Sequence, residues 1–212
     1  SKLFWSTEKP KNIDNSILRS VSKPFLNKGG IKVLKGNLGR SIIKISSVSE
    51  NNLKISAKAL VFENQSEVKK AFEEGKLERD VVVVVKGQGP KSNGMPELHS
   101  LTPLLSVIQE NGFNVALVTD GRMSGASGKI PAAIHLYPEA FESGPIGSIQ
   151  DGDIIVLDAL EGILMTESDL SKRNQKKRFT MNDQIGFGRE FFNVLRNSAN
   201  SPEKGGGINN LE

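Results

Sequence analysis

The sequence predicts an α/β fold, a single compact domain with a mixed β-sheet or a β-barrel at its core and helices packed outside. Five consecutive valines, Val81–Val85, are typical of a strand that is covered on both faces. A helix-like segment and a second apolar run at 114–119 follow, which is the order of a strand–helix–strand crossover. The length of 212 residues and the 37% apolar content suffice for a substantial core.

The segments before the valine run are predicted to be mostly β-structure. Residues 31–48 alternate apolar and polar side chains on both sides of a turn at Gly36–Gly39, and residues 51–62 continue the alternation. A short helix is expected over 66–74, with Ser66 as its N-cap and Gly75 as its stop.

The segments after the valine run alternate helix and strand. Thr102 is the expected N-cap of a helix with Pro103 at its first position, and this helix ends at Asn111-Gly112. A pair of strands joined around 159–162 follows a turn at 151–152. A last helix is expected over 182–197, with Phe187, Phe191 and Leu195 on one face.

The pattern divides the chain into three parts. Residues 1–28 lack sustained periodicity and are predicted to be a linker segment, residues 29–196 form the α/β domain, and residues 197–212 read as a loose C-terminal tail. We expect a cytoplasmic protein without a membrane partner, because no targeting pattern and no apolar run of about 20 residues is present.

Composition excludes several kinds of site. The chain has no cysteine, so it supplies no disulfide, no zinc–thiolate site and no ligands for an iron–sulfur cluster. Much of the net charge of +4 lies in a basic run at 172–178 without interleaved aromatic residues. We interpret this run as a solvated face and expect no nucleic-acid partner.

Two glycine-rich loops, Gly87–Gly94 and Gly121–Gly128, follow the two buried strands at the ends where α/β proteins bind ligands. The second loop is not a nucleotide-binding P-loop, because Met123 stands where the first glycine is required and Ile130 replaces the Ser or Thr. The first loop lacks the third glycine of the dinucleotide fingerprint. Nucleotide hydrolysis and hydride transfer therefore have no support.

The second loop has the composition of an anion site. Its glycines, Gly121, Gly125 and Gly128, let a ligand approach the backbone, and polar groups are supplied by Arg122, Ser124, Ser127 and Lys129. A tight structural turn whose serines cap the next helix is an equal alternative. Asp120 is expected to shape the turn.

Glu97 in the first loop is either an exposed carboxylate or a ligand for a hard cation. His99 and His135 are expected to be structural.

Two stretches carry a family resemblance. "GQGPKSNGMPELHSLTPLL" and "VALVTDGRMSGASGKIPAAIHLYPEA" resemble the C-terminal part of the dihydroxy-acid and phosphogluconate dehydratase family, and they are closer to its phosphogluconate branch. "GGIKVLKGNLGR", "GPIGSIQDGDIIVLDALEG" and "GREFFNVLR" extend the resemblance from about Gly29 to Arg196.

The resemblance implies a swivelling β/β/α fold and a hydro-lyase of the Entner–Doudoroff pathway that dehydrates 6-phosphogluconate to its 2-keto-3-deoxy product. Such an enzyme uses an iron–sulfur cluster of the 4Fe-4S kind and Mg²⁺. By resemblance, Ser124 is the base and Glu97 binds Mg²⁺. The expected substrate-binding residues are Asn93, Arg122, Ser127 and Lys129, and a solvated loop lysine is an equal alternative for Lys129.

The family's cluster cysteines lie in an N-terminal domain that this chain lacks, so that domain is an expected partner and the isolated chain is expected to be inactive. A homodimer is also implied. Dehydration of another sugar acid or dihydroxy acid, and a non-catalytic module that binds a sugar acid or phosphate, remain alternatives.

Overall fold

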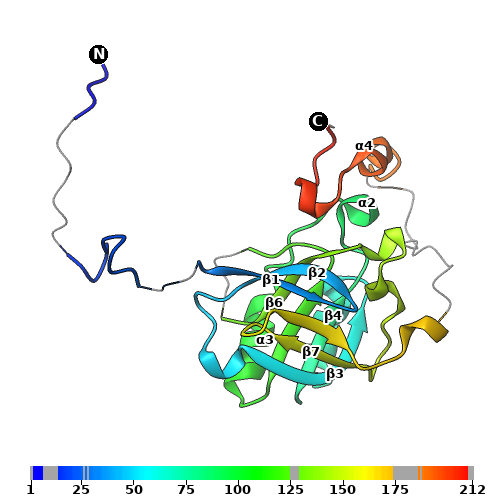
Figure 1. Cartoon of the computed structure of the whole chain (residues 1–212). Coiled ribbons are helices and arrows are strands. Elements are labelled where there is room, and N and C mark those ends of the chain that lie inside the picture. The colour runs from blue at the N-terminus through cyan, green and yellow to red at the C-terminus, as the bar shows by residue number, and fades with distance from the viewer. Residues whose placement is uncertain are drawn as a thin grey trace. The chain divides into compact units, whose positions relative to one another are not determined.

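The computed structural model describes residues 2–6, 14–25, 27, 29–124, 129–173, 186 and 188–209 (Figure 1). The chain divides into two units, Ser1–Gly30 and Ile31–Glu212. The first unit contains a turn in which the Leu18 N–H donates to the Asp14 carbonyl at 3.0 Å. Its described large apolar side chains, including Phe4 and Trp5, are exposed.

Eight strands of the second unit form a closed barrel in the order β1-β2-β6-β5-β4-β3-β7-β8. The strands are β1 (Ile31–Gly36), β2 (Gly39–Lys44), β3 (Lys54–Phe62), β4 (Val81–Val85), β5 (Val115–Thr119), β6 (Ala132–Tyr137), β7 (Ile154–Asp158) and β8 (Ile163–Thr166). The neighbours from β3 through β4 and β5 to β6 are parallel, and β1 pairs in parallel with β8. The other pairs are antiparallel, so the predicted mixed barrel is confirmed.

Strand β4 explains why five valines in a row are all buried. Val82 and Val84 belong to the barrel interior, to which all eight strands contribute side chains. Val81, Val83 and Val85 belong to a second core outside the barrel. Because successive side chains of a strand point to opposite faces, each face of β4 meets an apolar layer.

Two helices cover the outer face of the parallel strands. Helix α1 (Gln65–Glu73) connects β3 to β4, and α3 (Leu101–Glu110) lies between β4 and β5. Buried side chains of both helices, such as Val68 and Leu105, share the second core with β4 and β5. This is the expected crossover arrangement, with the carboxyl ends of β3, β4 and β5 at one end of the barrel.

Both predicted N-caps are wrong. Asn64, not Ser66, caps α1, and its side chain accepts from the Glu67 N–H at 3.0 Å. Helix α3 begins at Leu101 after Ser100 rather than at Pro103. Proline fits inside this first turn because the first four N–H groups of a helix have no intrahelical acceptor.

The last predicted helix is shorter than expected. Helix α4 spans Asn193–Ser198, whereas the sequence predicts 182–197. Phe191 and Leu195 are exposed rather than buried on a common face, and Phe187 lies outside the described residues. The remaining short helices are α2 (Pro90–Asn93), η1 (Glu50–Asn52), η3 (Ala140–Glu142), η4 (Pro145–Ser148), η5 (Leu170–Lys172) and η6 (Pro202–Lys204).

The two predicted strand pairs, β1–β2 and β7–β8, are confirmed as antiparallel hairpins. Strand β6 is not among the elements that periodicity predicts. Among the described residues, no helix combines the length and apolar character needed to cross a membrane.

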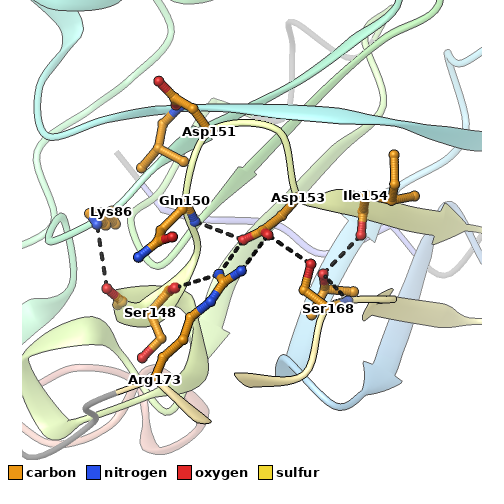
Figure 2. Close-up of polar contacts among 11 residues, drawn as sticks. Lys86, Ser148, Gln150, Asp151, Asp153, Ile154, Ser168 and Arg173 are labelled. Atoms are coloured by element: carbon orange, nitrogen blue, oxygen red, sulfur yellow. Dashed lines mark hydrogen bonds and ion pairs between the residues drawn. The ribbon is translucent and has the colours of Figure 1, made fainter. Parts of the chain in front are cut away.

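A polar network surrounds Asp153 (Figure 2). It lies at the same end of the barrel as the two glycine-rich loops. The Asp153 carboxylate accepts from both terminal nitrogens of Arg173, from the Ser168 hydroxyl at 2.7 Å and from the Gln150 N–H at 2.8 Å. These bonds tie the segment after β8 to the turn before β7. The side chain of Lys86, which directly follows β4, reaches the Gly147 carbonyl of η4 at 3.4 Å.

Candidate functional site

Two loops at the carboxyl ends of β4 and β5 meet at the end of the barrel. Loop A, residues 86–98, follows β4, and loop B begins at Asp120 after β5. Glu97 and Arg122 form an isolated parallel bridge, and the Leu98 N–H donates to the Arg122 carbonyl at 3.1 Å. Adjacent parallel strands end side by side, so their loops converge on one place.

The carboxylate of Asp120 holds both loops together. It accepts from the Gly87 N–H at 3.1 Å, from the Gln88 N–H at 2.8 Å and from the Ala140 N–H at 3.0 Å. Burial nevertheless raises the pKa of Asp120, because desolvation of the charge outweighs the backbone hydrogen bonds. The structure thus places Asp120 beneath the loops and away from solvent.

A second buried carboxylate, Glu139, lies beneath loop A. It accepts from the Lys91 and Ser92 N–H groups at the start of α2, both at 3.1 Å. A Cβ on Gly89 would lie 2.1 Å from the Glu139 Oε2, so only glycine allows this approach. Burial, with smaller contributions from the charges of Asp120 and Glu142, raises the pKa of Glu139 to about 7.

Gly121 allows loop B to pass close to loop A. A Cβ at Gly121 would lie 2.6 Å from the Gln88 Cβ. The Gly121 carbonyl accepts from the His135 N–H at 2.8 Å, and His135 has a positive φ of 55°. Burial and the charge of Arg122 lower the pKa of the His135 imidazole.

Three of the predicted site residues are in direct contact. The Ser124 N–H donates to Glu97 Oε1 at 2.6 Å, and Arg122 Nη1 donates to Glu97 Oε2 at 3.0 Å. Arg122 Nε also donates to the Met95 carbonyl at 2.7 Å. The side chains of Glu97 and Arg122 are 29% and 51% exposed. This cluster is therefore accessible, unlike Asp120 and Glu139.

A cavity of about 580 Å³ adjoins this cluster. Asn93 and Arg122 line it together with Arg189 and Arg196 from the segment after residue 186. Asn93 bridges loop A and that segment, since its Nδ2 donates to Gln88 Oε1 at 3.0 Å and its Oδ1 accepts from Arg189 Nη1 at 2.6 Å. Sequence reasoning missed both arginines, because nothing in "GREFFNVLR" distinguishes a pocket arginine from a solvated one.

The other predicted residues are less informative. Lys129 is exposed, and His99 is exposed at the end of loop A. Ser127, Gly125 and Gly128 lie outside the described residues, as does most of the basic run at 172–178.

The described residues do not complete a metal site. Among them, no group of three or more His, Asp or Glu side chains is arranged to hold an ion. Glu97 offers one accessible carboxylate, but both of its oxygens accept hydrogen bonds from Ser124 and Arg122. The described residues fit at most one ligand position of a hard cation, and the chain, which has no cysteine, offers no thiolate to an iron–sulfur cluster.

A family model described as "Dihydroxy-acid/6-phosphogluconate dehydratase C-terminal" matches residues 16–206. The chain belongs to this dehydratase C-terminal family. The match confirms the resemblance that the two loop motifs carry.

Named relatives of the family agree. The chain is 52% identical to the phosphogluconate dehydratase of Helicobacter pylori strain J99 over 212 residues, which cover 97% of this chain and 35% of the relative. It is 44% identical to the phosphogluconate dehydratase of Pseudomonas aeruginosa over 207 residues, 96% of this chain and 34% of the relative. The dihydroxy-acid dehydratase of Methanococcoides burtonii is 41% identical over 165 residues, 74% of this chain and 29% of the relative. The chain thus spans about a third of the length of these dehydratases.

Proposed function

We propose that this chain is the C-terminal domain of a hydro-lyase that dehydrates 6-phosphogluconate to 2-keto-3-deoxy-6-phosphogluconate. The proposal is supported by family membership and by one geometric observation. Loops from adjacent parallel strands bring Ser124, Glu97 and Arg122 into contact beside a cavity. An N-terminal part of the enzyme, a homodimeric assembly and a cytoplasmic location belong to the same proposal.

In the proposed reaction the Ser124 side chain, as its alkoxide, removes the proton from C2 of the sugar acid and becomes the neutral hydroxyl. The C2–H electron pair forms the enol double bond, the C3–O bond breaks, and the leaving hydroxyl departs as water after protonation. The enol then tautomerises to the 2-keto product. The Ser124 N–H is held by Glu97 Oε1, which fixes the backbone of the base relative to loop A.

Glu97 is proposed to contribute one ligand to Mg²⁺, and the N-terminal part would supply the other ligands and those of the iron–sulfur cluster. When bound, a divalent cation supplies Lewis-acid stabilisation of the developing enolate and of the leaving hydroxyl. Within this chain, Arg122 balances the Glu97 charge through Nη1. Asn93, Ser127 and Lys129 are proposed to bind substrate.

The test compares Ser124→Ala with the parent sequence in the proposed full-length enzyme, assayed anaerobically with Mg²⁺ at equal cluster content. We expect kcat for 6-phosphogluconate to fall about 100-fold or more, with KM changed less than about threefold, because a general base contributes to the chemical step. Ser47→Ala is the matched control, since Ser47 is exposed in the segment that leads to the start of β3, at the opposite end of the barrel.

Unchanged turnover of Ser124→Ala would contradict the proposed role of this loop. A parent enzyme that binds 6-phosphogluconate without converting it would favour the alternative of a binding module.

A further inference from the structure

The cavity beside loop A is strongly cationic. Three arginines line it, Arg122, which is paired with Glu97, and Arg189 and Arg196, and no carboxylate is among its described lining residues. Its volume of about 580 Å³ is in the range of small-molecule sites. In Figure 1, α2 and α4 lie next to each other at the top of the barrel, and side chains of both helices line the cavity.

Arg196 is the most buried of the three cations. It is only 8% exposed, and within the part of the chain that the structure describes no carboxylate lies within ion-pair distance of its guanidinium. Its Nη2 donates to the Arg189 carbonyl at 2.8 Å. Burial, and secondly the charge of Arg189, lowers the pKa of Arg196. A buried cation of this kind is costly unless an anion compensates it.

Arg189 is oriented before any ligand binds. Its Nη1 donates to Asn93 Oδ1 at 2.6 Å and its Nη2 to the Ser92 carbonyl at 3.3 Å. Asn93 is in turn bonded to Gln88, whose N–H is bound by Asp120. Through these bonds the Arg189 guanidinium is linked to Asp120, the buried carboxylate at which loop B begins. The Arg189 side chain is therefore already held in place and loses little conformational entropy when a ligand binds.

Arg122 connects the cavity to the candidate base. It lines the cavity and also contacts Glu97, whose other oxygen accepts from the Ser124 N–H. A ligand with its reacting carbons at Ser124 would therefore place a distant substituent in the cavity. Apolar side chains such as Phe192 and Leu195 complete the lining.

We propose that Arg189 and Arg196 form a phosphomonoester-binding subsite that selects a phosphorylated sugar acid over its non-phosphorylated counterpart. This inference rests on the proposed dehydratase function for the identity of the substrate, but the binding step itself requires no turnover. Guanidinium groups suit the ligand because they bind phosphate oxygens in a bidentate manner. The choice of substrate then depends on residues of this chain.

The first experiment measures binding to the 212-residue chain by isothermal titration calorimetry, with inorganic phosphate, 6-phosphogluconate and gluconate as separate probes. We expect both phosphates to bind and gluconate to bind at least about tenfold more weakly. Arg189→Gln should weaken phosphate binding about tenfold or more. Arg79→Gln, which removes the same charge from an exposed position just before β4, should leave binding unchanged.

Folding is checked separately, because Arg196 also supports the backbone of Arg189. Arg196→Lys keeps the charge but loses the fork geometry, and both pocket variants are compared with the parent by circular dichroism and thermal unfolding. A folded Arg189→Gln chain that binds phosphate as the parent does would overturn the proposal. Equal binding of gluconate and 6-phosphogluconate, or no binding of either phosphate, would also overturn it.

The second experiment uses the proposed full-length enzyme. Arg189→Gln should raise KM for 6-phosphogluconate about tenfold or more and raise KM for gluconate, which has no phosphate, by a smaller factor. If the variant keeps the parent KM although the isolated chain binds phosphate, the cavity is covered by the N-terminal part and the selection role is wrong. A parent enzyme that does not convert 6-phosphogluconate would instead refute the proposed function. Failure of the phosphate subsite and failure of the proposed function are therefore distinguishable.

Discussion

Glu139 and Asp153 are two almost inaccessible carboxylates at the same end of the barrel, and their pKa values are shifted in opposite directions. Glu139 is 0% exposed and its pKa is raised to about 7, whereas Asp153 is 6% exposed and its pKa is lowered to about 2. The difference lies in their partners. Glu139 is bonded by backbone N–H groups, and Asp153 is bonded chiefly by the Arg173 guanidinium (Figure 2).

The comparison shows that backbone donors alone do not offset the burial of a carboxylate here, while a guanidinium does. In the Asp153 network the charge of the carboxylate is compensated by the Arg173 guanidinium, and the network joins the segment after β8 to the turn before β7. Asp120 and Glu139, under the two loops, are buried without such compensation, and they hold the loops in the conformation that brings Ser124 to Glu97. The barrel end therefore holds, next to the candidate site, two buried carboxylates whose charge is not compensated by a cation.

The largest effect is expected for Asp120→Ala. The substitution leaves three buried backbone N–H groups without their acceptor, and each such group costs about 1–3 kcal/mol. We expect the free energy of unfolding to fall by about 3–5 kcal/mol in urea titrations of the chain. Asp151→Ala, which removes a single bond to the exposed Val61 N–H, is the matched control. If Asp120→Ala lowered the free energy of unfolding by less than about 1 kcal/mol, Asp120 would not be what holds the two loops together.

Glu139 predicts a stability that falls as pH rises. Its pKa is about 7 in the folded chain and 4.5 ordinarily, so the folded state binds the proton more tightly and is favoured at low pH. Between about pH 4.5 and 7 the free energy of unfolding should fall by about 3 kcal/mol from this group, and the raised pKa of Asp120 acts in the same direction.

Urea titrations of the parent and of Glu139→Gln across this pH range measure the effect. The parent should lose stability relative to Glu139→Gln as the pH rises, because glutamine does not ionise. Parallel pH profiles would show that Glu139 is not the titrating group.

Asp153 predicts the opposite pH dependence, with a smaller amplitude. Its pKa is lowered from 3.8 to about 2, so its contribution is fully present above about pH 4 and is lost as the pH falls toward 2. We expect about 1–2 kcal/mol, because the Arg173 side chain remains partly exposed.

Arg173→Met should lower the free energy of unfolding by about 2 kcal/mol near neutral pH and reduce this acid sensitivity. Lys69→Met, which breaks the exposed Lys69–Glu73 pair, should change it by less than about 0.5 kcal/mol. Equal effects of the two variants would remove the distinction between the Asp153 network and an ordinary surface ion pair.

Local sequence patterns predicted much of the fold. Val81–Val85 indicated a doubly covered strand, and the structure assigns alternate valines to the barrel interior and to the helical layer. Strand β6 was not predicted because its residues, which include two alanines and a histidine, show little alternation of apolar and polar side chains. Closure through β1 and β8 depends on a pairing between residues distant in sequence, such as Lys35 and Ile163, which no local pattern contains.

Only part of the candidate site was predicted, because the rest depends on contacts between residues that are distant in the sequence. The loop motifs identified Ser124, Glu97 and Arg122, which the structure brings into contact. The buried support from Glu139 and the cavity arginines come from other parts of the chain. Their roles follow from tertiary contacts, and neither a charge run nor a periodicity marks them in the sequence.

The seam between β1 and β8 has a consequence for biosynthesis. The first barrel strand, Ile31–Gly36, pairs with the last, Ile163–Thr166, so a chain emerging from the ribosome cannot close its barrel until β8 has been synthesised. Arg189 and Arg196 are made later still. The nascent chain therefore keeps its β1 edge open until β8 has been made, which is an interval in which a chaperone or a neighbouring nascent chain can pair with that edge.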